Sequence, residues 1–378
     1  MCVSVEQIVE QIHSSRGRFV LAISGGGGRA VSALLEMPGA SRTVLEVVVP
    51  YSAGAMIKWL GGRPDQFCSP HTARAMATVG LLRAIGYDES DALQFGAACT
   101  ASLATDRPKR GPHRVHLALQ TTSLTKTRSV ELQKGHRIRQ EEEQLVARLV
   151  LNMVAEACGL EGRLELDLLE GERLDESQTI ARQPWRELFL GHLEMVRHGG
   201  APYQEGEPPG AVFPGAFNPV HVGHRRMAEI SRRLLGRRVD FEISILNPDK
   251  PPLDYLEMER RTGQFGPAES IWLTRAPTFE EKSRLFPGTT FIVGTDTLRR
   301  IARPCYYGDD PAARDAAMQR IAERGCRFLV FGRDLGTGFF GLGDLDLPEP
   351  LVSLCREVPA EQFRQDISST EIRKSGGW

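Results

Sequence analysis

The sequence lacks several features, and each absence excludes a class of protein. Its 378 residues include 7 cysteines, none in a CxxC pair, so neither a zinc site nor a disulfide framework is indicated. No apolar run approaches the roughly 20 residues that cross a bilayer. Lys plus Arg (47) balances Asp plus Glu (48), which removes the bulk electrostatic case for nucleic acid. Glu6 and Glu10 stand where a signal peptide needs an apolar core. We therefore expect a cytoplasmic protein that binds neither membranes nor nucleic acid.

What the sequence does contain is a regular alternation of short apolar segments with amphipathic ones. At roughly 150 residues per domain, the length predicts two domains. The alternation predicts an α/β class for both, with a layered first domain and a largely parallel sheet. In the first half we expect strands at 19–23, 44–49, 96–100 and 114–120, and helices at 5–12, 29–36, 71–85, 88–95 and 140–157.

The clearest linker is rich in glycine and proline, at 199–202 and 206–210. It predicts three regions: a first domain at 1–160, an acidic and helical connector at 161–207, and a second domain at 208–378. Within the connector we expect a helix at 185–196. The alternation resumes with a strand at 211–213, so the second domain is also predicted to be α/β.

The strongest motif is Phe213-Pro-Gly-Ala-Phe-Asn-Pro-Val-His-Val-Gly-His224, between a predicted strand and a predicted helix. His221 and His224 are three residues apart on the incoming turn, so both imidazoles can face one point. The free N–H groups and positive dipole end of the helix face the same point. This combination predicts an oligophosphate site, with Gly215 allowing close backbone approach.

A second motif, Ile367-Ser-Ser-Thr-Glu-Ile-Arg373, lies close to the C-terminus. Ser368, Ser369 and Thr370 are typical of a helix N-cap, with hydroxyls and free amides available to a phosphate. Arg373, one turn further on, can bring a planar guanidinium to the same anion.

Together the two motifs resemble the signatures GxFxPxHxGH and ISSTxIR of the nucleotidyltransferase superfamily, whose members include nicotinate- and nicotinamide-mononucleotide adenylyltransferases. The resemblance implies a Rossmann-like domain with a mainly parallel sheet. It also implies that AMP passes from ATP to a small phosphorylated acceptor, with pyrophosphate released. Magnesium would arrive with ATP, and we expect no metal site built by the protein.

The same resemblance implies roles for particular residues. His221 and His224 would hold the ATP phosphates, with Lys250 and Arg373 as further catalytic phosphate contacts. The nucleotide-binding set is Gly215, Phe217, Asn218, Asp296, Ser368, Ser369 and Thr370. Lys250 lies in a proline-rich loop and Asp296 ends a GxD turn, a combination that favours a pyridine mononucleotide as acceptor. Two alternatives stay open here: Lys250 as a solvated loop lysine, and Trp272 as either a stacking wall for a base or a core residue.

The first half, over about residues 5–158, resembles the C-terminal domain of the competence-damage-inducible proteins, which includes nicotinamide-nucleotide amidohydrolase. Ser24, Tyr51 and Thr100 match its short motifs and form a candidate second site. The family's motif lysine is replaced by Met56, which leaves a serine nucleophile without an obvious base.

Several functional alternatives follow. The first domain is either a working deamidase that feeds the transferase or a degenerate domain kept for binding, regulation or assembly. The second domain is a pyridine-nucleotide adenylyltransferase, a cytidylyl- or adenylyltransferase for another acceptor, or a non-catalytic nucleotide sensor. The sequence leaves the oligomeric state open, homo-oligomers included.

Overall fold

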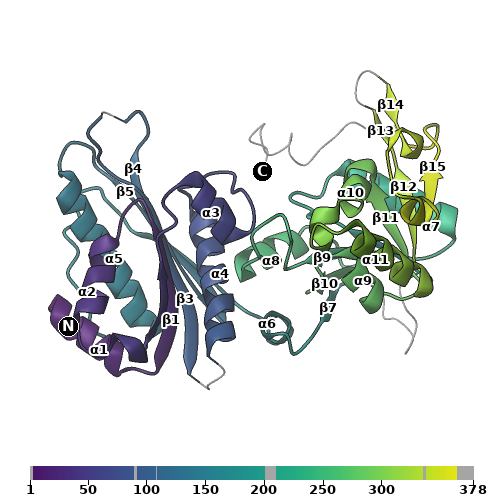
Figure 1. The fold of residues 1–378 in the computed structure, drawn as a ribbon. Helices are drawn as coiled ribbons and strands as arrows, with labels where there is room; N and C mark the ends of the chain where they lie inside the picture. Colours follow the sequence, from purple (N-terminus) through teal and green to yellow (C-terminus); the bar gives the residue numbers. More distant parts are fainter. Residues whose placement is uncertain (1–2, 89–91, 108, 201–209, 335–337, 364–378) are drawn as a thin grey trace. The chain divides into compact units, whose positions relative to one another are not determined.

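A computed structural model of the chain describes residues 3–88, 92–107, 109–200, 210–334 and 338–363. The chain forms two compact units, each described here by itself (Figure 1). Unit 1 contains residues 1–186 together with the short segment 249–256, and unit 2 contains residues 187–248 and 257–378.

Unit 1 is built on a six-stranded sheet of order β2-β1-β3-β4-β5-β6. The strands are β1 (Gly17–Ser24), β2 (Val44–Val48), β3 (Leu93–Ser102), β4 (His113–Thr121), β5 (Leu124–Leu132) and β6 (Asp175–Ile180). β1 pairs in parallel with β2 and β3, whereas β3, β4, β5 and β6 pair antiparallel. The prediction of a largely parallel sheet was therefore wrong for this unit, because tight connections such as Thr122-Ser123 join neighbouring strands as hairpins.

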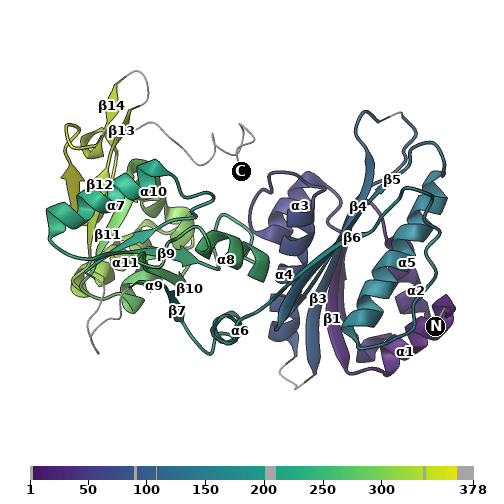
Figure 2. The same ribbon diagram turned by 180° about the vertical axis from the view of Figure 1, so that it is seen from behind.

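Helices cover both faces of this sheet (Figures 1 and 2). One face carries α1 (Val5–Ser14), α2 (Gly28–Glu36) and α5 (Arg139–Ala157), and the other carries α3 (Ala53–Leu60) and α4 (Pro70–Tyr87). The 3-10 helix η1 (Ala40–Arg42) precedes β2. The larger core lies on the α5 face, where buried aliphatic side chains of β1, β3 and β4 meet those of α5. The α4 face has a smaller core of alanines and methionines.

Two predicted helices were wrong. Helix α4 ends at Tyr87, with Asp88 as its C-cap, and strand β3 begins at Leu93, where the chain pairs with β1. The helix expected at 185–196 is the shorter α6 (Gln183–Leu190), after which Gly191 has a φ of +84° and the chain enters strand β7 (Met195–His198). In both cases sheet pairing overrides a local helical pattern.

Unit 2 contains a seven-stranded sheet of order β15-β12-β11-β8-β9-β10-β7. Besides β7 its strands are β8 (Ala211–Pro214), β9 (Val239–Ser244), β10 (Ile271–Thr274), β11 (Thr290–Gly294), β12 (Arg327–Phe331) and β15 (Cys355–Val358). All neighbours pair in parallel except β7, which is antiparallel to β10. The chain runs outward from β8 through β9 and β10, then returns to β11 on the other side of β8. The point between β8 and β11 is thus a topological switch point, where such sheets bind ligands.

The helices of unit 2 are α7 (Val222–Leu235), α8 (Tyr255–Thr262), α9 (Phe279–Leu285), α10 (Thr295–Ile301), α11 (Pro311–Glu323) and α12 (Glu349–Val352). The 3-10 helices η2 (Pro304–Tyr307) and η3 (Leu342–Asp344) and a small sheet of β13 (Arg333–Asp334) and β14 (Phe339–Phe340) complete the unit. This architecture confirms the predicted Rossmann-like second domain with a mainly parallel sheet.

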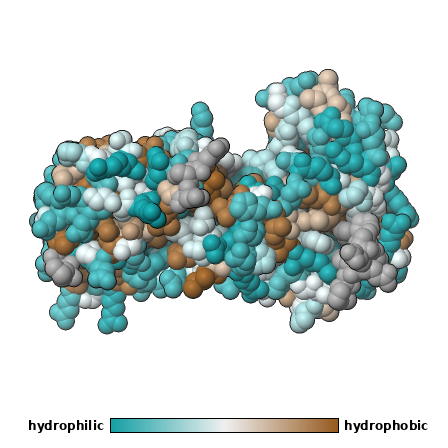
Figure 3. Space-filling model, turned by 90° about the horizontal axis from the view of Figure 1, so that it is seen from below, coloured by the Kyte–Doolittle hydropathy of each residue, from teal (hydrophilic) through white to brown (hydrophobic). Residues whose placement is uncertain are grey.

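Apolar residues on the surface are interspersed with polar ones on the face shown in Figure 3. Among the described residues, no helix is long and apolar enough to span a membrane.

Unit 1 is made of two separate segments of the chain. After β9 and residues 245–248 of unit 2, residues 249–256 belong to unit 1, and the chain is again part of unit 2 from Glu257 onward. Helix α8 begins at Tyr255, so its first two residues belong to unit 1 and its remainder to unit 2.

Candidate functional site

The motif of residues 213–224 lies at the switch point between β8 and β11, where sheets of this kind bind ligands. It begins at the carboxyl end of β8 and ends in the first turn of α7, whose N-cap is His221. Gly215 is required because a Cβ there would lie 2.6 Å from the ring of Phe217. That ring is buried and packs edge-on against Phe213 and Phe241, which anchors the loop to the sheet.

Three side chains that follow the loop in sequence hold it in place, two through its backbone and one through a side chain. The Gln264 amide donates to the carbonyl of Phe217 at 2.9 Å and accepts from the backbone N–H of Val220 at 2.8 Å. Arg261 donates to the carbonyl of Ala216 at 3.1 Å, and Arg260 donates to the side chain of Asn218 at 2.5 Å. These three residues belong to no motif that could be recognised in the sequence. They come from α8 and the turn after it, so the position of the loop depends on α8.

The two histidines lie together at the start of α7. Their ring centroids are 3.7 Å apart with the planes 29° from parallel. The backbone N–H of His221 donates to Nδ1 of His224 at 3.2 Å, so the proton of the neutral His224 ring is on Nε2. His221 Nδ1 is buried and has no hydrogen-bond partner among the described residues. An orphaned ring nitrogen beside a helix N-terminus is a group that a ligand can satisfy.

Both imidazoles are held neutral. Burial and then the neighbouring His221 lower the pKa of His224 to about 3, and burial lowers the pKa of His221. The apolar surroundings of His224 explain the larger shift, since its ring lies edge-on to Phe213 and Phe217. A bound oligophosphate would raise the pKa of both histidines, because its negative charge favours the protonated form.

The other predicted residues of the second domain have different locations. Asp296 lies in the first turn of α10, directly after β11, and accepts from Arg333 at 2.6 Å. Asp296 therefore follows β11, the second strand of the switch point. Lys250 lies in the segment that belongs to unit 1, and its phosphate contact stays a prediction. Ser368, Ser369, Thr370 and Arg373 lie outside the described residues. Trp272 is on β10, where its indole N–H donates to Asp240 at 2.7 Å.

In unit 1 the sheet register brings Ser24 and Thr100 opposite each other on β1 and β3. The same row continues to His116 on β4 and Ser129 on β5. Thr100 Oγ1 and His116 Nε2 are buried without a partner among the described residues, while His116 Nδ1 is 2.8 Å from the Ser129 hydroxyl. Burial and then Arg114 lower the pKa of His116 to about 4. Tyr51, the third predicted residue, is 69% exposed.

The glycine-rich turn after β1 already holds an anion from its own chain. The Glu143 carboxylate on α5 accepts the backbone N–H of Gly27 at 2.9 and 3.0 Å and that of Arg29 at 3.2 Å. These amides form the start of α2, which is the position that a ligand phosphate would take. Sequence reasoning missed Glu143 because it is 116 residues from Gly27. The Ser24 hydroxyl donates to the carbonyl of Pro50, and Met56 is part of the core.

Residues 212–264 match the model of the cytidylyltransferase-like family. One relative is named "Probable nicotinate-nucleotide adenylyltransferase", from Gloeobacter violaceus. It is 29% identical over 190 residues, which is 44% of this chain and 85% of the relative. The predicted resemblance of the second domain is confirmed by these matches.

Solved structures of competence/damage-inducible proteins also match the chain. The protein from Agrobacterium tumefaciens is 22% identical, with a TM-score of 0.33, over 42% of this chain and 98% of its own. A CinA superfamily protein from Klebsiella pneumoniae is 16% identical, with a TM-score of 0.33, over 42% of this chain and 99% of its own.

Proposed function

We propose that unit 2 transfers AMP from ATP to a pyridine mononucleotide and releases pyrophosphate. The single observation that carries the proposal is the neutral, stacked pair His221 and His224 at the N-terminus of α7, beside the switch point of a parallel sheet. The motif match and the name of the Gloeobacter relative support this choice of reaction.

In the proposed reaction an oxygen of the acceptor's 5′-phosphate attacks the α-phosphorus of ATP. The bond to the β-phosphate oxygen breaks, and pyrophosphate leaves with the electron pair. His221 and His224 offer N–H donors to the phosphate oxygens as charge moves onto the leaving group. The loop held by Gln264 aligns ATP, and positioning of this kind supplies a large part of the rate. Magnesium would enter the site bound to ATP.

For unit 1 the contacts favour a binding or assembly role over hydrolysis. Met56 lies in the core where the related family has a lysine, and the amides of the glycine turn are occupied by Glu143. The Ser24 hydroxyl donates a hydrogen bond to the carbonyl of Pro50, and a backbone carbonyl cannot act as a base at neutral pH.

The experiment is pyrophosphate release from ATP and magnesium by the full chain. Nicotinate mononucleotide, nicotinamide mononucleotide, phosphopantetheine and simple phosphoesters are offered one at a time. We expect release with a pyridine mononucleotide only. Release with phosphopantetheine alone would favour the alternative acceptor class, and release with none of them would contradict the proposal.

A further inference from the structure

We propose that Gln264 is a positioning residue for the histidine pair His221 and His224, acting through the backbone of residues 217–220. The inference rests on the proposed function for its effect on the reaction. Its structural basis lies wholly within unit 2, where one half-buried amide side chain holds the loop of residues 215–221 at two points.

Both ends of the Gln264 amide bond to the loop. Its NH2 group donates to the carbonyl of Phe217 at 2.9 Å, and its oxygen accepts from the backbone N–H of Val220 at 2.8 Å. These two bonds lie on either side of residues 218–219. A third bond, from the same NH2 group to the carbonyl of Arg261 at 3.2 Å, ties the side chain to its own segment. With donor and acceptor both engaged, the amide has little freedom to turn, and it fixes the backbone at both points.

These two fixed points are directly connected to the histidine pair. Val220 immediately precedes His221, whose own N–H donates to Nδ1 of His224 at 3.2 Å. The ring of Phe217 packs edge-on against the ring of His224, with the centroids 5.1 Å apart. Gln264 therefore acts on one histidine through the peptide before it, and on the other through the apolar ring that contacts it.

The segment around Gln264 is itself fixed within unit 2. The neighbouring Phe265 ring is buried and packs against Phe241 of the sheet, with the centroids 4.8 Å apart. Arg225, in the first turn of α7, donates to the carbonyl of Gln264 at 3.0 Å and forms an ion pair with Glu269. The sheet and α7 thus hold the residue that holds the loop between them.

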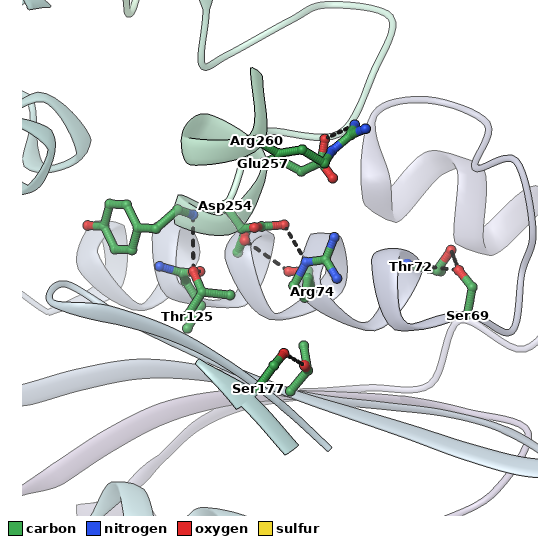
Figure 4. Close-up of polar contacts among 12 residues, drawn as sticks. Ser69, Thr72, Arg74, Thr125, Ser177, Asp254, Glu257 and Arg260 are labelled. Atoms are coloured by element: carbon green, nitrogen blue, oxygen red, sulfur yellow. Dashed lines mark hydrogen bonds and ion pairs between the residues drawn. The ribbon is translucent and has the colours of Figure 1, made fainter. Parts of the chain in front are cut away.

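Helix α8 supports the same loop through an arginine. Arg260 donates to the side chain of Asn218 at 2.5 Å and to Glu257 at 2.8 Å, and Figure 4 shows the pair Glu257 and Arg260 on this helix. That contact ends at a side chain of the loop, whereas Gln264 bonds to the backbone directly before His221. A substitution of Gln264 therefore tests the position of the histidines more directly than one of Arg260.

We expect Gln264→Met to lower kcat/KM for ATP at least tenfold in the full chain, because a displacement of about 1 Å at the reacting centre costs on the order of a hundredfold in rate. Methionine keeps the length of the side chain and removes the amide. Part of the loss should be a rise in KM for ATP, which a smaller folded fraction would not produce. Gln264→Glu keeps an acceptor for the N–H of Val220 and loses the donor to Phe217, so its kcat/KM should lie between the two.

The matched control is Gln319→Met. Gln319 is an exposed residue of α11 in the same unit, and its amide donates to Glu323 one turn further along that helix at 3.1 Å. We expect this variant to keep the KM for ATP of the native chain.

The imidazole of His224 provides a readout that needs no substrate. Burial and then the neighbouring His221 lower its pKa to about 3, so the ring is neutral at pH 5 in the native chain. When Gln264→Met releases the loop, water reaches this ring, its pKa rises towards the ordinary value, and a protonated fraction forms at pH 5. NMR of the imidazole C–H groups measures that fraction, with the signal assigned by its loss in His224→Ala. Gln319→Met should keep the native signal.

This measurement separates the inference from the proposed reaction, because it uses neither ATP nor an acceptor. A His224 signal that keeps its native position at pH 5 in Gln264→Met would overturn the inference, whatever the pyrophosphate assay gives. If the methionine variant does not fold, Gln264→Asn takes its place, since its amide is one methylene shorter and cannot reach both the Phe217 carbonyl and the Val220 N–H.

Discussion

The molecule contains two turns of the same type that differ in what occupies them. Each joins a buried strand to a helix: Gly25–Gly28 between β1 and α2, and residues 215–221 between β8 and α7. In the first, Glu143 accepts the free amides. In the second, a ring nitrogen of His221 has no partner among the described residues. A glycine turn before a helix is therefore not sufficient to indicate an anion site, because the protein's own carboxylate can fill it.

The largest expected effect comes from removing the histidine pair. We expect His221→Ala with His224→Ala to lower turnover by 10² or more, equivalent to about 2.7 kcal/mol of transition-state stabilisation. The measurement is pyrophosphate release at saturating ATP. The control is His192→Ala, at an exposed histidine of unit 2 that pairs with Glu187. We expect this variant to release pyrophosphate at the native rate. Near-normal turnover in the double variant would remove the phosphate role of this turn.

The next effect tests the filled turn. Glu143→Ala leaves the amides of Gly27 and Arg29 without their acceptor, so we expect the free energy of unfolding of unit 1 to fall by about 1–3 kcal/mol. Urea unfolding measures it. Gln144→Ala, an exposed neighbour on α5, should change stability by no more than about 0.5 kcal/mol. Equal values for the two variants would mean that the carboxylate contributes nothing to this turn.

Acid should weaken both units, because each contains histidines whose pKa the fold lowers. The folded pKa values of His224 (about 3) and His116 (about 4) lie below the ordinary value of 6.5, so the unfolded chain binds more protons between these limits. Stability is then fully present above pH 6.5 and falls with acid, by at most about 1.4 kcal/mol per pH unit for each histidine.

Urea unfolding at pH 7, 6 and 5 tests this for His116→Gln against the exposed control His136→Gln. The first variant should lose less stability on acidification than the native chain, and the second should follow the native chain. Identical acid slopes for all three proteins would show that His116 is not held neutral by the fold.

The smallest effect is expected at Ser24. If unit 1 does not hydrolyse amides, Ser24→Ala and the native chain should give the same background ammonia release from nicotinamide mononucleotide. Release by the native chain that disappears in the variant would instead show a working deamidase, and unit 1 would then have an open site despite Glu143.

Local patterns could be predicted from the sequence, and distant partners could not. The paired histidines were predicted because three-residue spacing at a helix start is a local property. Ser24 and Thr100 were predicted as site residues, but their neighbour His116 was not. His116 lies opposite Thr100 because β3 and β4 pair antiparallel, whereas we had expected a largely parallel sheet. The helix predicted at 88–95 was wrong because strand β3 gains more from pairing with β1 than a short helix gains alone. Arg74 gives no sign in sequence of its partner Asp254.

The second visit of the chain to unit 1 also sets an order of assembly. Arg74 is synthesised 180 residues before Asp254. At about 5–20 residues per second, the ion pair between them therefore cannot form until on the order of 10–40 s after Arg74 is synthesised. During translation, the α4 face of the first sheet thus stays unfinished while β7, β8 and β9 emerge from the ribosome. Chains stalled on the ribosome before residue 249 should be cut by protease near α4, and chains stalled after unit 2 has emerged should resist.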